Sequence, residues 1–176
     1  MLGVMTTIAK HEQEYVVWQN RAHRFYLGAR LLYRNEMYSP AAYSATIALE
    51  LLLKATLIYW DRSFNPFEAG HGMAKLTRMV KNKARNVSGL AIPIYFYNGQ
   101  RYLTVSRYPT NGKGIGIPAS FVDDLDRVFT DLILLVPFQH NTELKHALSG
   151  KSRSALVTLR HKNQQIRRLR NALRQA

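Results

Sequence analysis

Residues 41–58 read AAYSATIALELLLKATLI, an apolar segment whose only charged side chains are those of Glu50 and Lys54. A helix that is apolar on nearly all sides is buried on several of them. We therefore expect this segment at the centre of a helical bundle or at a contact between subunits. Glu50 precedes Lys54 by four residues, so the two charges share one helical face in the order that favours an ion pair. We expect this structural pair to neutralise itself on a narrow exposed stripe.

The flanking sequence predicts further helices around this segment. Apolar and aromatic residues recur with a helical period over residues 12–37, and the Ser39-Pro40 dipeptide starts the apolar helix. Amphipathic patterns of the same kind predict helices over residues 71–86 and 118–136. Short links make consecutive helices antiparallel neighbours. The predicted fold class is all-α, an up-and-down bundle of four or five helices.

Two segments add to this bundle. Residues 94–105 read IYFYNGQRYLTV, in which Asn98-Gly99 separates two aromatic and β-branched runs. Because both positions of the favoured hairpin turn need a positive φ, this pattern predicts an inserted β-hairpin at about residues 92–105. Residues 151–176 carry a narrow apolar seam among bases, which predicts a C-terminal basic amphipathic helix.

Length and composition limit the class of protein. The chain has 176 residues, enough for one domain over residues 1–150 and the helical extension at 151–176. The sequence contains no cysteine, which excludes disulfides and thiolate metal sites. His140 and His146 are six residues apart, a separation that differs from the spacing of a helical zinc pair. We therefore expect neither a metal ion nor a cofactor.

The sequence also bears on localisation. Residues 1–10 lack a charged region followed by an apolar core, so we expect no signal peptide. Glu50 and Lys54 interrupt the longest apolar run, which argues against a membrane span. We expect a cytoplasmic protein without membrane contact.

The net charge of +14 is unevenly distributed. Residues 72–91 hold five bases and no acid, and residues 151–176 hold eight bases and no acid. Such blocks suggest a phosphate-rich or an acidic partner. The bases that we select as candidate nucleic-acid or phosphate contacts are Lys75, Arg78, Lys81, Arg160, Arg167, Arg168, Arg170 and Arg174.

Four features occur in the order of a known family. They are a long first helix with aromatic residues, a second helix with Leu49-Glu50 and Lys54-Ala55, a third helix that starts near Gly70-His71, and Arg107-Tyr108-Pro109 before the last core helix. Together they resemble the HEPN domain, named for higher eukaryotes and prokaryotes nucleotide-binding. The resemblance covers about residues 10–137. It implies a bundle of four or five helices that is often a dimer.

The resemblance implies a function only in broad terms. Many HEPN proteins are metal-independent ribonucleases or toxins, often paired with a nucleotidyltransferase antitoxin. Their active site has an Arg followed, after four to six residues, by a His that assists proton transfer. None of the six His residues of this chain has an Arg five to seven positions before it. The ribonuclease motif is therefore absent.

The sequence allows two roles for each of two residues, which lie near the starts of the third and the last core helix. His71 either caps backbone groups where the third helix begins or contacts a ligand. Arg107 either pairs with Glu50 inside the bundle or holds a phosphate with its planar fork of donors. His71 and Arg107 are also the candidates for catalysis at a non-standard site.

These observations favour a non-catalytic module that binds RNA, a nucleotide or another phosphate-rich partner through basic surfaces. A toxin-like ribonuclease with a non-standard site stays open, as does a protein-interaction module that binds an acidic partner. We also expect a homodimer, because the helix over residues 41–58 is apolar on more sides than its neighbours in one chain cover.

Overall fold

The computed structural model describes residues 2–85, 87, 89–99, 116–137 and 143–175. Within these ranges the chain forms seven α-helices and one 3-10 helix and has no strand, so the predicted all-α class is confirmed. The elements are α1 (Leu2–Arg34), α2 (Tyr38–Trp60), α3 (Met73–Lys83), the 3-10 helix η1 (Ile94–Asn98), α5 (Phe121–Ile133), α6 (Glu143–Leu148), α7 (Arg153–Arg160) and α8 (Ile166–Gln175).

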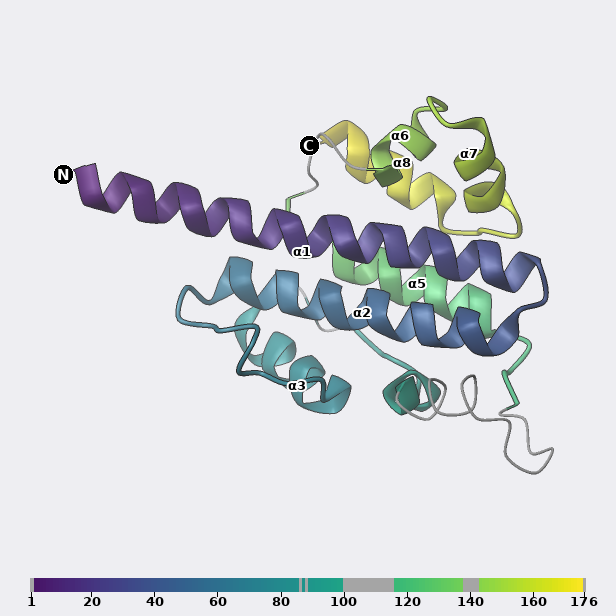
Figure 1. Cartoon of the computed structure of the whole chain (residues 1–176), viewed down its shortest axis with the longest axis horizontal. Coiled ribbons are helices and arrows are strands. Elements are labelled where there is room, and N and C mark those ends of the chain that lie inside the picture. The colour runs from purple at the N-terminus through teal and green to yellow at the C-terminus, as the bar shows by residue number, and fades with distance from the viewer. Residues whose placement is uncertain (1, 86, 88, 100–115, 138–142, 176) are drawn as a thin grey trace.

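Helix α2 is the centre of the bundle, as its sequence predicts. It lies antiparallel to α1 after a tight turn in which Glu36 has a φ of 60° (Figure 1). It also contacts α3, α5 and η1. Although α2 has the length and composition of a membrane span, 78% of its most apolar window is buried inside the bundle. The helix is therefore the core element around which the other helices pack.

The burial of α2 removes the reason for which we expected a homodimer. Leu49, Leu52, Leu53 and Ile58 are fully buried by helices of the same chain. The described elements thus cover the apolar faces of α2 without a second subunit. A homodimer stays a prediction.

The predicted β-hairpin is wrong in its described half. Residues 94–98 form η1, where Phe96 is buried against Phe121 with 5.3 Å between ring centroids. Gly99 has a φ of −54°, whereas the hairpin turn needs a positive value. A Cβ atom at Gly99 would instead collide with the Thr46 side chain, so the glycine serves a close approach to α2. Residues 100–105, the predicted second strand, lie outside the described residues.

The predicted single C-terminal helix is also wrong. It is divided into α7 and α8 by residues 161–165, where Lys162 has a φ of 50°. The Asn163 side chain accepts a hydrogen bond from Gln165 N at 2.8 Å and donates one to Tyr26 Oη at 3.1 Å. The break therefore turns polar groups toward the core.

Arg30 of α1 binds the chain segment between α7 and α8 to the helical bundle. Its guanidinium donates to the main-chain oxygens of Thr158 and His161 and forms an ion pair with Asp126 of α5. Tyr26 Oη donates to the other Asp126 oxygen at 2.7 Å. Burial raises the pKa of Asp126 to about 6, and the Arg30 charge opposes this rise. Because Arg30 and Asp126 are both buried, each compensates a charge that would be costly alone.

The C-terminal helices are consequently part of the packed body and not a free tail. Figure 1 shows α6, α7 and α8 gathered over α1, on the side away from α3. Leu159 of α7 and Leu169 of α8 are fully buried. Removal of residues 151–176 would expose this apolar surface and leave Arg30 without its carbonyl partners.

His23 gives the fold a measurable pH dependence. The side chain is fully buried on α1, edge-on to Phe129, and burial lowers its pKa to about 3 from an ordinary value of 6.5. Below pH 6.5 the unfolded chain therefore binds a proton that the folded chain rejects, so stability falls as the pH falls. Between pH 7 and pH 5 we expect a loss of about 2 kcal/mol from this residue.

Urea unfolding at both pH values measures this loss, with His23→Leu as the comparison. The substitution removes only the His23 contribution and keeps those of Asp126 and the other carboxylates. The parental protein should therefore lose about 2 kcal/mol more than the variant between pH 7 and pH 5. Equal losses in the two proteins would show that His23 becomes protonated in the folded state.

Candidate functional site

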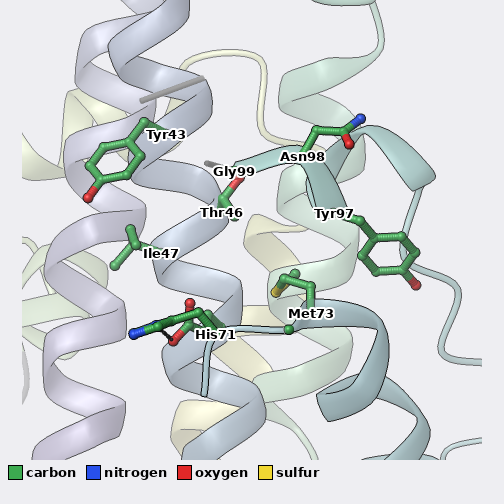
Figure 2. A pocket seen from close by; sticks show the side chains of 10 residues that line it. Tyr43, Thr46, Ile47, His71, Met73, Tyr97, Asn98 and Gly99 are labelled. Atoms are coloured by element: carbon green, nitrogen blue, oxygen red, sulfur yellow. Dashed lines mark hydrogen bonds and ion pairs between the residues drawn. The ribbon is translucent and has the colours of Figure 1, made fainter. Parts of the chain in front are cut away.

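A pocket of about 730 Å³ lies between α2, η1 and the start of α3. Figure 2 shows side chains of α2 on one side and Tyr97 of η1 on the other, with Asn98 and Gly99 at the end opposite His71. Its lining residues are Tyr43, Thr46, Ile47, Glu50, His71, Gly72, Met73, Tyr97, Asn98 and Gly99. The pocket therefore combines aromatic, apolar and polar groups.

Local backbone geometry presents these residues to one space. Tyr43, Thr46, Ile47 and Glu50 have the i, i+3, i+4, i+7 spacing of a single helical face. On the other side, Gly70 has a φ of 71°, a conformation that glycine adopts at little cost. This turn leads the chain past His71 into α3.

Glu50 is the polar centre of the pocket. Its Oε1 atom is 3.0 Å from Lys54 Nζ and 2.9 Å from His71 Nδ1. Glu50 is 6% exposed and Lys54 is 3% exposed, so the expectation that they lie on an exposed stripe is wrong. Lys54 Nζ also lies 5.3 Å from the ring centroid of Trp18 on α1, a cation–π distance. The two residues thus form a buried ion pair that joins α1, α2 and the α3 start.

His71 connects this buried pair to solvent. Because a carboxylate oxygen accepts, Nδ1 of His71 must carry the proton and donate to Glu50. The His71 side chain is 73% exposed, so the opposite ring nitrogen, Nε2, is open to solvent. Such a carboxylate–imidazole arrangement fixes the ring orientation and can serve either ligand binding or proton transfer. The sequence left a backbone cap and a ligand contact open for His71, and the structure pairs its ring with Glu50.

The basic residues predicted on α3 are exposed beside this pocket. Lys75, Arg78 and Lys81 are exposed, and Lys75 follows the lining residues Gly72 and Met73. Within the described part of the chain, the only ion pair of α3 joins Lys83 to Asp61, with 3.0 Å between Nζ and Oδ2. Lys75 Nζ donates to Ala69 O at 3.5 Å, but no described acid compensates the charge of the three selected bases, so these charges are available to a ligand.

The C-terminal bases lie apart from the α3 bases and differ among themselves. Arg168 Nη2 is 2.9 Å from Asp131 Oδ1, so an acid of α5 already compensates its charge. Arg170 is half-buried, while Arg160, Arg167 and Arg174 are exposed. Helices α7 and α8 pack over α1 and α6, whereas α3 packs on α2 and η1 (Figure 1). The structure therefore does not join the two basic blocks into one site.

Arg107 lies outside the described residues, so neither of its predicted roles is visible. The described partners of Glu50 are Lys54 and His71. Among the described residues, no group of three or more His, Asp or Glu side chains is placed to hold a metal ion.

Comparison with known proteins identifies the family of this chain. The HEPN domain profile matches residues 15–113, which is more than half of the chain. The chain belongs to the HEPN domain family. No curated protein and no solved structure matches it. Every residue that lines the pocket falls inside the HEPN match, whereas α5 to α8 follow it.

Sequence reasoning found only part of this HEPN site. It selected Glu50, Lys54 and His71, but it did not bring His71 to Glu50. The spacing of Tyr43, Thr46 and Ile47 before Glu50 is a signal that was available in the sequence. Tyr97 and Asn98 were placed in a projecting β-hairpin, so the sequence did not bring them to α2.

The Glu50–Lys54 pair should behave as a coupled unit in the stability of the domain. Lys54→Met removes the cation and leaves the buried Glu50 carboxylate with His71 alone, so we expect the free energy of unfolding to fall by about 3–5 kcal/mol. The double variant Glu50→Gln/Lys54→Met removes both charges and should lose clearly less. Urea unfolding at pH 7 of the parental protein, both single variants and the double variant gives the coupling energy. Additive losses would contradict a coupled pair.

Proposed function

We propose that this HEPN domain is a non-catalytic module that binds RNA through the exposed bases of α3, beside the pocket on α2. The observation that carries the proposal is the position of Lys75, Arg78 and Lys81, three exposed bases on a helix that contains no acid. Lysine and arginine side chains attract a phosphate backbone and release its counterions on binding. The absence of an Arg-x4–6-His motif argues for binding without cleavage.

The alternative basic surface on α7 and α8 is less suited to this role. Asp131 neutralises Arg168, and Arg170 is half-buried. This segment also has a structural task, since the main-chain oxygens of Thr158 and His161 accept hydrogen bonds from the buried Arg30. The charge of α7 and α8 thus adds to the positive electrostatic potential of the protein. This potential attracts RNA, while the main contacts are made by α3.

Neutralising the α3 bases tests the proposal. We expect Lys75→Gln/Arg78→Gln/Lys81→Gln to raise the Kd for a short single-stranded RNA by at least about tenfold at moderate salt, because three phosphate contacts are lost. The slope of log affinity against log salt should become shallower by about 2, which is three contacts at about 0.7 each. Fluorescence anisotropy over a range of salt concentrations measures both quantities.

The matched control removes the same charge from the other basic block. Arg160→Gln/Arg167→Gln/Arg174→Gln changes three exposed bases of α7 and α8 and should leave the Kd within about threefold. Circular dichroism confirms that both variants fold. A large loss in the control together with unchanged binding in the α3 variant would refute the assignment to α3.

A second function, metal-independent RNA cleavage, is favoured by one specific observation. The 2.9 Å contact between Glu50 Oε1 and His71 Nδ1 orients an imidazole whose Nε2 is exposed. A neutral imidazole held in this way can accept the proton of a ribose 2′-hydroxyl, and positioned proton transfer of this kind contributes roughly 10²–10⁴-fold to a rate. No arginine is among the residues that line the pocket beside His71, which places this function second.

Incubation of the purified protein with labelled RNA and EDTA separates the two functions. The non-catalytic proposal expects intact RNA after prolonged incubation. Cleavage that is lost in both His71→Ala and Glu50→Gln, but persists in the α7–α8 control variant, would instead select the Glu50–His71 pair as a ribonuclease site. Cleavage that survives His71→Ala would point to a contaminating nuclease.

A further inference from the structure

We propose that the pocket between α2, η1 and α3 takes one unpaired guanine base, which makes the domain selective for single-stranded RNA that contains G. This inference rests on the proposed RNA binding at α3 and adds the substrate class. It uses a cavity and a carboxylate oxygen that the phosphate contacts do not explain.

The size and position of the pocket fit a single nucleotide. Its volume of about 730 Å³ lies within the range of roughly 300–1,000 Å³ that is typical of small-molecule sites. The first exposed base of α3, Lys75, follows two lining residues, Gly72 and Met73. A phosphate held by Lys75 and Arg78 would therefore leave the attached nucleotide next to the opening.

The walls of the pocket suit a flat ring. Tyr43 and Tyr97 line it from opposite sides, and Ile47 and Met73 add apolar surface between them (Figure 2). Both tyrosines are half-buried, so each retains surface for contact with a ligand. Stacking of a base on an aromatic side chain contributes about 1–3 kcal/mol and does not depend on the base. The aromatic walls thus explain affinity for a base but not a choice among bases.

Glu50 supplies the choice among bases. Its Oε1 atom already accepts from Lys54 and His71, whereas its Oε2 atom accepts no hydrogen bond from the described residues. A carboxylate oxygen with unused capacity on the wall of a pocket favours a ligand that brings donors. Lys54 and His71 hold the carboxylate in place and offset its charge, so it repels a nearby phosphate less than an unpaired carboxylate would.

Guanine is the base that matches this acceptor best. Its Watson–Crick edge presents two adjacent donors, N1–H and the N2 amino group. Uracil presents a single N3–H flanked by two carbonyl oxygens, which a carboxylate repels. Adenine and cytosine each offer one amino group beside a ring acceptor. Pairing in a duplex occupies the guanine donors, so the inference requires an unpaired base.

Base selectivity is measured with two short single-stranded RNAs that share length and charge. One is all uridine and the other carries a single central guanosine; a uridine–adenosine duplex serves as the third ligand. We expect the G-containing RNA to bind about tenfold more tightly than the other two, in keeping with the discrimination of a well-formed contact to a base edge. Glu50→Gln should remove this preference, so that the two single-stranded RNAs bind with similar affinity.

A control variant and a replacement variant allow the pocket to be tested even if Glu50→Gln does not fold. Glu68→Gln removes the same charge from the exposed 61–72 link, outside the pocket, and should keep the preference. If Glu50→Gln does not fold, Tyr97→Leu and Tyr97→Phe replace it. The leucine should weaken G-containing RNA several-fold through lost stacking, and the phenylalanine should bind like the parental protein.

The outcomes distinguish this inference from the proposed function. Salt-sensitive binding with equal affinity for all three RNAs would overturn the guanine pocket and leave RNA binding at α3 intact. A preference for G that survives in Glu50→Gln would overturn the role of the carboxylate, and with it the inference. Failure of the parental protein to bind any RNA would overturn both.

Discussion

The burial of most of α2 among helices of the same chain is the constraint on which the rest of this structure depends. An apolar helix of this kind gains stability only when other elements remove its surface from water. Helices α1, α3, α5 and the 3-10 helix η1 meet this need within one chain. Phe96 illustrates the consequence, because its fully buried ring packs against Phe121 of α5 and holds η1 in place. The position of η1 in turn forms one wall of the pocket.

Because α2 is largely buried, its few charged groups need a physical explanation. Glu50 and Lys54 are almost completely removed from water, where a lone charge would be costly. They compensate each other, and His71 adds a donor from the chain segment that enters α3. Replacement of such a pair by apolar residues is often neutral or stabilising, so stability alone does not account for its presence. A recognition role for the carboxylate is consistent with its position on the pocket wall.

A second buried ion pair has a different task. Arg30 and Asp126 join α1 to α5, and the remaining Arg30 donors bind main-chain oxygens of the C-terminal segment. The basic block at residues 151–176 is thereby integrated into the packed body, with Leu159 and Leu169 in the core. Separation of this block from α3 leaves two basic surfaces with different surroundings. The chain thus uses one arginine for packing and leaves others exposed on α3, α7 and α8.

The sequence by itself determined the all-α class, the central place of α2 and the HEPN family, because helical periodicity and an uninterrupted apolar face are local properties of the chain. It also identified the Glu50–Lys54 pair and His71, but not the meeting of His71 with Glu50. Only the tertiary structure decided that meeting, the 3-10 helix in place of a strand at residues 94–98, and the break at Lys162. In each case a long-range contact outweighed a local preference: His71 reaches Glu50, Phe96 packs on Phe121, and Asn163 bonds to Tyr26. Such contacts join residues far apart in the sequence, where no local pattern records them.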